Sequence, residues 1–509
     1  MSDWTAGYVA DIDYTYGYYA ELNPLRLRLA FLQNGLVCPE VGTACELGFG
    51  QGLSTNLHAA ASITRWYGTD FNPAQAGFAQ ELARFSGATM SDDSFAEFAE
   101  RSDLPEFDYI GLHGIWSWVS DENRSVIVDF IRKKLKVGGV LYISYNTQPG
   151  WSGFAPIRQL FSAHAEVMGT QGQGVLGRVS GAVEFAEKLF AVNPLYLQVN
   201  PLVIERFNKA KGLNPHYLAH EYFNRDWHPM YFRDMAGWLE AAKLQFACSA
   251  HYLDHVEGLN LKEEQRAFLK EIPDPLFREG VRDFMVNQQF RRDYWVRGAR
   301  KLSLLEQMDA IRAERVVLST HRASVSLKVT GSLGEASMSE DIYNPILDLL
   351  ADYQPRTIAE IEQALVGETM SFVNLMQAIM VLAGAGHIAS VQKAEVIEAQ
   401  RPRTDSLNQY LMKKARGNSE LGHLASPVTG GGVAVGRFQQ LFLLALLSGK
   451  TKPEEWAAFA WRSLVATGQK LIKEGVALES EKDSLVELTS LADAFAEKQL
   501  PVMKALQIV

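Results

Sequence analysis

Short apolar runs alternate with helical segments through the first 150 residues of the chain. One run ends at Glu46, and four more cover residues 66–70, 88–90, 107–113 and 140–146. Such runs are typical of strands that are buried on both faces of a sheet, whereas the run from 53 to 61 has a helical pattern. The alternation predicts an α/β fold with an open, mainly parallel sheet that binds its ligand at the carboxyl ends of the strands.

Beyond residue 150 the pattern becomes mainly helical. Residues 153–228 are predicted to be a helical insertion or substrate cap, because a helix at 231–244 and a strand at 246–252 then resume the sheet. Residues 260–315 are predicted to form charged amphipathic helices, one of them running from Phe284 to Leu302.

Three helices and a short strand after a glycine turn are expected between residues 343 and 391, an order that resembles a winged helix. Thr357 is expected to cap the second helix, with Glu360 completing the capping box. DNA binding needs many basic side chains, and Arg356 is the one Lys or Arg in this stretch. Protein docking or a structural role is therefore preferred to DNA binding.

The C-terminal part is expected to hold helices at 437–448, 453–474 and 482–498, for substrate recognition, self-association or scaffolding. The predicted division of the chain is an N-terminal cofactor-covering segment (1–40), a core (41–152 with 229–258), an insertion (153–228), a helical regulatory or linking region (259–330), a winged-helix-like domain (331–395) and a C-terminal helical domain (396–509).

Composition and charge narrow the classes of partner. With 509 residues and 47% hydrophobic residues, the chain can form several domains with cores of their own. A net charge of −10 disfavours nucleic acid and modestly favours basic partners such as lysine-rich proteins. No apolar run is long enough to span a bilayer and no signal segment is recognised, so a cytoplasmic protein is expected, with a homodimer left open.

Metal and redox chemistry are not indicated. Cys38, Cys45 and Cys248 form no C-x-x-C pair, so reduced thiols are expected. His220 lacks the second histidine of a metalloprotease motif, and His251 with His255 falls across a predicted strand end.

A glycine-rich turn follows the first predicted strand. The sequence Glu-Leu-Gly-Phe-Gly-Gln-Gly, from Glu46 to Gly52, has glycines at alternate positions after an acid. Glycine permits positive φ and lets the backbone approach a ligand closely, and the next helix points its N-terminus at the turn. Asp70 ends the second strand about 20 residues later, where a carboxylate that binds ribose is expected.

The spacing of these glycines favours one class of cofactor. Dinucleotide sites use G-x-G-x-x-G, so S-adenosylmethionine is preferred here to a nicotinamide or a flavin. Asp93, which is preferred to Asp92, is expected to accept a hydrogen bond from the adenine amine, and Phe95 is expected to lie beside the adenine ring. The predicted cofactor-binding residues are Glu46, Gly48, Gly50, Gly52, Asp70, Phe71, Asp93, Ser94, Phe95, Tyr16 and Tyr18.

Five sets of residues are specific when taken together: Tyr16 to Tyr19 with Glu21 to Pro24, the turn from Glu46 to Gly52, Asp93 to Phe95, His113 to Val119, and Ser144 to Asn146 with Pro149 to Trp151. As a set they resemble class I S-adenosylmethionine-dependent methyltransferases of the bacterial type that carry a methyltransferase regulatory domain. The best described relatives methylate lysines of bacterial outer-membrane proteins. The resemblance therefore implies a Rossmann-like methyltransferase sheet and N-methylation of protein lysines, with the N-terminal tyrosines folded over the cofactor.

Methyl transfer sets simple chemical demands. The sulfonium leaves readily, so the enzyme must align the nucleophile with the S–CH₃ bond and exclude water. A lysine must arrive as the neutral amine, and an apolar, aromatic channel lowers its pKa. Aromatic rings also attract the sulfonium and the methylated ammonium, by about 0.5–2 kcal/mol each. Tyr14 and Tyr19, near the N-terminus, are further rings available for this purpose.

Residues after the fourth and fifth strands are the candidates for this chemistry. Trp116 and Tyr145 are expected to line the acceptor channel, His113 to accept a proton or orient the amine, and Asn146 to bind the incoming nitrogen through its amide carbonyl. The predicted substrate contacts are Trp118, Trp151, His220 and Tyr222. Plain packing remains the alternative for each ring, and a strand-end or turn role for His113 and Asn146.

Two classes of function stay open at this point. The first is a methyltransferase that acts on protein lysines, or on a small-molecule, glycan or lipid-precursor nucleophile. The second is a non-catalytic scaffold that senses the cofactor. An intact turn and the acids Glu46, Asp70 and Asp93 are compatible with both.

Overall fold

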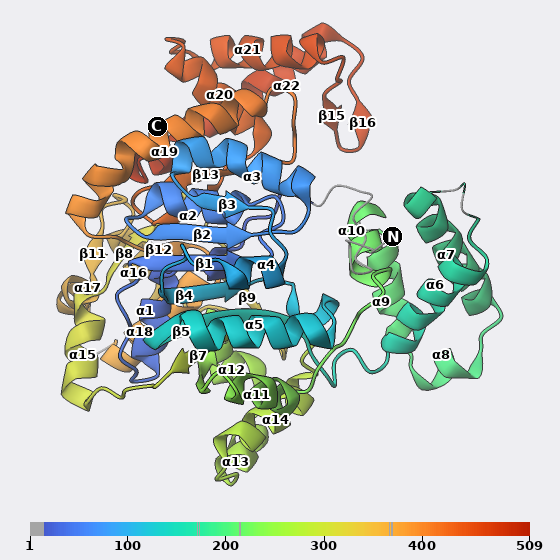
Figure 1. The fold of residues 1–509 in the computed structure, drawn as a ribbon. Helices are drawn as coiled ribbons and strands as arrows, with labels where there is room; N and C mark the ends of the chain where they lie inside the picture. The colour runs from blue at the N-terminus through green and yellow to red at the C-terminus, as the bar shows by residue number, and fades with distance from the viewer. Residues whose placement is uncertain (1–14, 171, 173, 213–214, 366, 368–369) are drawn as a thin grey trace.

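The computed structural model describes residues 15–509 except 171, 173, 213, 214, 366, 368 and 369. A seven-stranded sheet lies at its centre, in the order β3-β2-β1-β4-β5-β7-β6 (Figure 1). The first five strands are parallel: β1 (Thr43–Leu47), β2 (Arg65–Thr69), β3 (Thr89–Ser91), β4 (Phe107–Leu112) and β5 (Leu135–Asn146). This confirms the predicted α/β class and the mainly parallel sheet.

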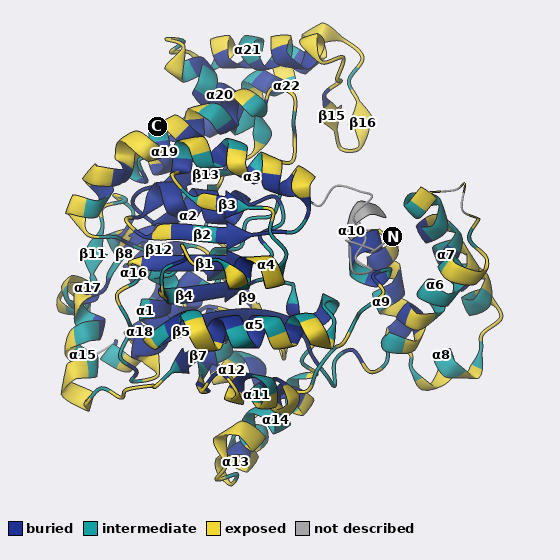
Figure 2. Cartoon of the chain, in the orientation of Figure 1, coloured by how far each residue is buried: buried dark blue, intermediate teal, exposed yellow. Residues whose placement is uncertain are grey.

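Helices cover both faces of the sheet, because its central strands carry apolar side chains on both sides (Figure 2). Ile110, Leu141 and Ile143 pack on one face together with residues of α5 and α11. Tyr109 and Tyr142 point to the other face, in the same cluster as residues of α1. The helices of the core are α1 (Leu25–Gln33), α2 (Leu53–Ala61), α3 (Pro73–Ser86), α4 (Phe95–Glu100), α5 (Asp121–Lys134) and α11 (Phe232–Glu240).

Two more strands complete the sheet. One of them, β7, runs antiparallel to both of its neighbours and corrects a prediction. β7 (Phe290–Arg297) lies between β5 and β6 (Leu244–Ser249), within the stretch expected to be a helix from Phe284 to Leu302. The helix α14 ends at Val286, and Asn287 follows with φ of 49°. The charged side chains of this stretch suggested an amphipathic helix, but Arg291 is buried against three carboxylates, those of Glu279, Asp283 and Asp293.

Residues 153–228 form a helical group with an apolar cluster of its own, beside the N-terminal end of α5 (Figure 1). Its helices are α6 (Ala155–Val167), α7 (Gly174–Ala191), α8 (Leu195–Val199), α9 (Leu202–Lys211) and α10 (Pro215–Tyr222). After β6 follow α12 (Glu257–Asn260), α13 (Glu263–Lys270), α14 (Pro275–Val286), β7 and α15 (Leu304–Ala313).

Residues 315–390 form the next module. Its three-stranded sheet has the order β11-β8-β12, so β8, which comes first along the chain, lies in the middle. Thr357 and Glu360 form the predicted capping box, with N···O distances of 2.7 and 3.1 Å. Classification as a winged helix stays a prediction. The elements are β8 (Arg315–Leu318), β9 (Lys328–Gly331), β10 (Gly334–Ser337), α16 (Glu340–Leu349), β11 (Arg356–Thr357), α17 (Ile358–Leu365), α18 (Phe372–Gly384) and β12 (Ile388–Ser390).

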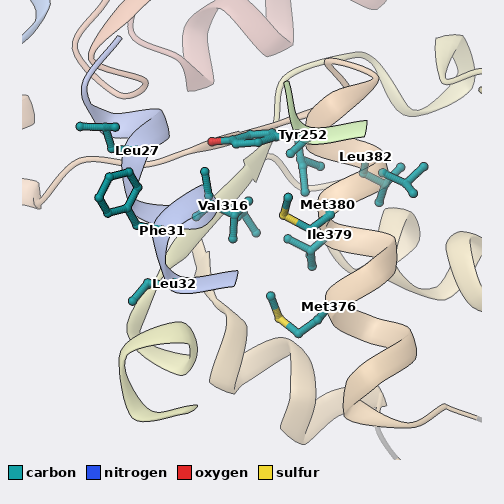
Figure 3. Close-up of a cluster of buried hydrophobic side chains, with 14 of the residues drawn as sticks. Leu27, Phe31, Leu32, Tyr252, Val316, Met376, Ile379, Met380 and Leu382 are labelled. Carbon is teal, nitrogen blue, oxygen red and sulfur yellow. The ribbon is translucent and has the colours of Figure 1, made fainter. Parts of the chain in front are cut away.

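This module shares its core with the sheet domain. Leu27, Phe31 and Leu32 of α1 lie opposite Met376 and Ile379 of α18 in one continuous cluster (Figure 3). The N-terminal helix is therefore held between the sheet and the module.

The C-terminal part packs on α2 and α3 through the long helix α19 (Ala394–Lys414). The helix expected at 453–474 ends at Ala466, and a hairpin follows that uses positive φ at Gly468 and Gly475. The remaining elements are β13 (His423–Ser426), β14 (Gly431–Ala434), α20 (Arg437–Leu447), α21 (Pro453–Ala466), β15 (Ile472–Lys473), β16 (Val476–Ala477), α22 (Glu481–Ala494) and α23 (Leu500–Ala505). Among the helices described, none has the length and apolar character needed to cross a bilayer.

Candidate functional site

The glycine turn leads from β1 into α2 with three left-handed residues. Gly48, Gly50 and Gly52 have φ of 74°, 58° and 66°, which L side chains rarely adopt. A Cβ atom at Gly48 would lie 2.6 Å from Cδ1 of Ile115, and one at Gly52 would lie 2.5 Å from Cβ of Ala79. The turn therefore requires glycine both for its conformation and for its contacts.

Two buried carboxylates hold this turn. Asp70 Oδ2 accepts a hydrogen bond from the Gly50 amide at 2.8 Å, and Asp70 Oδ1 accepts one from the Asn72 amide at 3.1 Å. Burial raises the pKa of Asp70 to about 6, although both amides lower it. Glu46 accepts from the Thr55 hydroxyl. The pKa of Glu46 is raised to about 8, mainly by burial and also by the nearby Asp70, whereas the hydrogen bond from Thr55 lowers it.

The segment after β3 takes the predicted position. Asp93 pairs with Arg101 at 3.1 Å, and its carbonyl accepts from the Thr69 hydroxyl. The Ser94 hydroxyl is occupied as the N-cap of α4, in a capping box with Glu97. Asp92 is exposed.

One cavity collects these residues at the carboxyl ends of β1, β2 and β4. It is lined by Tyr19, Glu46, Gly48, Phe49, Gly50, Asp70, Phe71, Gln75, Asp93, Ser94, Phe95, His113, Gly114, Ile115, Trp118, Val119, Ser120 and Asn123. Three of these are acids, and no Lys or Arg is among the described lining residues. The cavity therefore suits a cationic ligand that also offers aromatic or apolar surface.

His113 is the titratable base of this cavity. Its ring stacks on Tyr19, with ring centroids 3.7 Å apart, and its Nδ1 lies 2.8 Å from the Tyr142 hydroxyl. Burial lowers the pKa of His113 to about 4, while Glu21 raises it and Arg292 lowers it. The imidazole is therefore neutral near pH 7.

The N-terminal segment reaches the cavity through Tyr19, not through the tyrosines that were predicted. Tyr16 packs against Phe78, and Tyr18 lies between His58 and His423. The Tyr19 amide donates to the Ser54 hydroxyl of α2 at 2.9 Å, which fixes this segment over the site. Tyr14 lies outside the described residues.

Trp116 and Tyr145 do not reach the cavity, in contrast to the prediction. Trp116 is fully buried, its Nε1 is 3.3 Å from the Met230 sulfur, and its ring meets Trp238 edge to face. Tyr145 points to the α5 and α11 face, and its hydroxyl donates to Asp293 at 2.9 Å. Strand residues alternate between faces, so Tyr142 and Ser144 face the side that holds His113 instead.

Asn146 also lies outside the cavity lining. It is buried at the end of β5, and its amide nitrogen Nδ2 has no hydrogen-bond partner among the residues that the structure describes. Its predicted role in binding the acceptor nitrogen remains a prediction.

Of the predicted substrate contacts, Trp118 alone lines the cavity, and its Nε1 is 3.4 Å from the Glu221 carbonyl. Trp151 and Tyr222 pack inside the insertion, and His220 is buried there. The Trp151 Nε1 donates to the Gln289 carbonyl at 2.8 Å, and Arg206 covers its ring. Their aromatic character therefore reflects the core of the insertion.

Eight of the described lining residues are not among the predicted site residues: Tyr19, Phe49, Gln75, Gly114, Ile115, Val119, Ser120 and Asn123. Of these, Tyr19 was expected only as one of the rings available near the N-terminus. Phe49 and Ile115 stand inside segments that were singled out, so their position in the turn and after β4 was the available signal. Gln75 and Asn123 lie on helices, and no feature of the sequence marked them as lining residues. Across the described ranges, no cluster of three or more His, Cys, Asp or Glu has the arrangement of a metal site.

Comparison with known proteins places the chain among relatives that share its length. The family model described as "Predicted methyltransferase regulatory domain" matches residues 214–297. The uncharacterized protein sll1526 of Synechocystis is 39% identical over 514 residues, covering 99% of each chain. The uncharacterized protein RP789 of Rickettsia prowazekii is 27% identical over 278 residues, which is 54% of this chain and 49% of that protein.

A solved structure shares the whole fold. PKMT2 from Rickettsia typhi in complex with AdoHcy superposes with a TM-score of 0.69 at 17% identity, covering 95% of this chain and 98% of that chain. The matched regulatory region contributes β6 and β7 of this chain to the central sheet, so it is part of the core and not an appended domain.

Proposed function

We propose that this chain, which belongs to the class I S-adenosylmethionine-dependent methyltransferases that carry a methyltransferase regulatory domain, N-methylates lysine side chains of a protein substrate. The observation that carries the cofactor is the set of three acids that line the cavity. Glu46, Asp70 and Asp93 line it together with aromatic rings, no Lys or Arg is among the described lining residues, and Arg101 pairs with Asp93 from outside the lining. S-adenosylmethionine bears an ammonium and a sulfonium, which such a cavity attracts.

Each acid has a place suited to one part of this cofactor. Asp70 stands at the end of β2, with lone pairs left over for the two ribose hydroxyls. Glu46 is proposed to hold the ammonium, and Asp93 with Phe95 the adenine. AdoHcy, which is bound to PKMT2, is what remains of the cofactor after methyl transfer.

The lysine acceptor is supported by the outer wall of the cavity. Ile115, Trp118 and Val119 present apolar and aromatic surface there. Such a wall strips water from an incoming lysine and lowers its pKa, so the amine arrives with its lone pair free for in-line attack. No residue has to protonate the leaving sulfur. The net charge of −10 also favours approach of a basic protein segment.

Transfer to protein distinguishes this function from its alternatives. The purified chain is incubated with methyl-labelled S-adenosylmethionine and a lysate of its source organism, and the label is followed in protein, lipid, glycan and small-molecule fractions. We expect label on discrete protein bands. Label confined to the other fractions would move the assignment to a small-molecule, glycan or lipid-precursor acceptor, and binding without transfer would support a sensing scaffold.

Cofactor affinity is expected to rise with pH between 6 and 7.5. The free protein keeps Glu46 protonated up to a pKa of about 8, while a bound ammonium favours the carboxylate. The ionised fraction therefore falls roughly 20-fold from pH 7.5 to pH 6, and affinity falls with it. Asp70, with a pKa of about 6, adds to the loss near pH 6.

Calorimetry in buffers of different ionisation enthalpy measures this linkage. Binding at pH 7 should release close to one proton in the wild-type chain. The Glu46→Gln variant should bind S-adenosylmethionine more weakly, and its binding should release a much smaller fraction of a proton. Affinity that is flat or falls over this pH range would contradict the placement of the ammonium at Glu46.

A further inference from the structure

For one group of the cofactor, its carboxylate, the described lining offers neutral donors but no cation. No Lys or Arg of the described lining is available to it. The amides of the three glycines in the turn are already used inside the protein: Gly48 donates to the Thr69 carbonyl at 2.8 Å, Gly50 to Asp70 at 2.8 Å and Gly52 to the Phe49 carbonyl at 2.9 Å. A carboxylate brought among three acids needs a donor from another part of the wall.

A chain of hydrogen bonds determines which nitrogen of His113 carries the proton. The Gly114 amide, which can only donate, bonds to Ser144 Oγ at 2.8 Å. Two hydroxyls lie next to His113 Nδ1: that of Tyr142 is 2.8 Å away and that of Ser144 is 3.4 Å away. Burial holds the pKa of Tyr142 well above its usual value, so this hydroxyl keeps its proton.

Counting the protons of this group assigns the tautomer. If Nδ1 accepts, it takes the proton of Tyr142 across the shorter of the two contacts, and Ser144 Oγ still accepts from the Gly114 amide. If Nδ1 carried the proton, it would offer neither hydroxyl an acceptor and would add a third proton donor beside them. The neutral ring therefore bears its proton on Nε2.

The same arrangement removes His113 from the role of proton acceptor. Nδ1 is engaged behind the cavity wall, and Nε2 already carries a proton. The ring is held flat against Tyr19, so it has one fixed direction in which to donate. A donor fits an oxygen acceptor, whereas the lone pair of an attacking amine must stay free.

We propose that His113, held as its Nε2–H tautomer by Tyr142 and Ser144, donates a hydrogen bond to the carboxylate of the methionine part of S-adenosylmethionine. The inference rests on the cofactor proposed above and is independent of the acceptor. His113 is then a cofactor-binding residue, and Tyr142 and Ser144 are positioning residues that act through it.

Two ligands that differ only in this carboxylate test the proposal. S-adenosylmethionine and its decarboxylated analogue, which keeps the ammonium and the sulfonium, are titrated calorimetrically into wild type and His113→Phe, a variant that keeps a ring against Tyr19. The variant should lose about 10- to 100-fold in affinity for S-adenosylmethionine and no more than about twofold for the analogue. An equal loss for both ligands, or none for either, would overturn the proposal.

The positioning role has its own matched pair. Tyr142→Phe removes the donor to Nδ1, and Tyr294→Phe removes a buried hydroxyl on the neighbouring strand that bonds instead to the Glu21 carbonyl at 3.2 Å. Nitrogen NMR of labelled histidine should show an Nε2-protonated His113 in wild type and Tyr294→Phe, with a shift toward Nδ1 protonation in Tyr142→Phe. An Nδ1-protonated wild type would overturn the tautomer.

These outcomes separate the inference from the proposed function. If label never reaches lysine but His113→Phe loses affinity only for the ligand that has the carboxylate, the role of His113 is supported and the lysine acceptor is wrong. If wild type does not bind S-adenosylmethionine at all, both the cofactor and the inference fall.

Discussion

Asp70→Ala should reduce affinity for S-adenosylmethionine by about 100-fold or more. The proposed ribose contacts are two hydrogen bonds to a carboxylate, each contributing about 1.5–3 kcal/mol. The same change leaves the Gly50 and Asn72 amides without their acceptor, so the turn also loses its support. Titration calorimetry measures the affinity, and circular dichroism confirms that the variant is folded.

Asp92→Ala and Asp70→Asn are the controls for this effect. Asp92 is exposed and outside the cavity, so its removal should leave the affinity unchanged. Asp70→Asn loses the charge, so it should bind S-adenosylmethionine more weakly than wild type. Because it retains a hydrogen-bond acceptor for the turn, its stability should be closer to that of wild type than the stability of Asp70→Ala. Wild-type affinity in Asp70→Ala would contradict the position of the ribose.

Trp116→Ala should lower the free energy of unfolding by about 3–5 kcal/mol, whereas Trp118→Ala should change it by about 1 kcal/mol or less. Trp116 is fully buried against Met230 and Trp238, so its loss leaves a large cavity in the core. Trp118 lies two residues later and lines the ligand cavity. Denaturant titration of both variants measures the two changes.

The pair should differ in the opposite way in methyl transfer. Trp118→Ala should slow transfer to a protein acceptor, with cofactor affinity close to that of wild type, because the ring is proposed to line the path of the lysine. Trp116→Ala, measured under conditions where it stays folded, should transfer at close to the wild-type rate. The reverse result would restore Trp116 to the acceptor channel and place Trp118 in a structural role.

The cofactor half of the cavity followed from the sequence because its signals are local. Alternate glycines after an acid fix the backbone of one turn, and strand ends place Glu46, Asp70 and Asp93 at one edge of a parallel sheet. These features depend on the order of residues within single elements, so no tertiary information was needed to find them.

The acceptor half was harder to predict because it depends on which face a side chain takes. A shift of one residue separates Tyr145, in the opposite core, from Ser144, beside His113. Aromatic residues at Trp151 and Tyr222 looked like substrate contacts, yet they fill an independent helical core. The charged stretch from Phe284 to Leu302 looked like an amphipathic helix, yet Arg291 and Asp293 form a buried ion pair within a strand.

The central claim is that the methyl group of S-adenosylmethionine reaches a lysine side chain. The most direct measurement is to hydrolyse the labelled protein fraction to its amino acids and identify those that carry the label. Asp70→Ala, whose affinity for the cofactor is expected to be lower by about 100-fold or more, is the control, at a cofactor concentration that saturates only the wild type. The account predicts label in N-methylated lysine, with none above background in the control. Label in any other amino acid, or label that persists in the control, would contradict it.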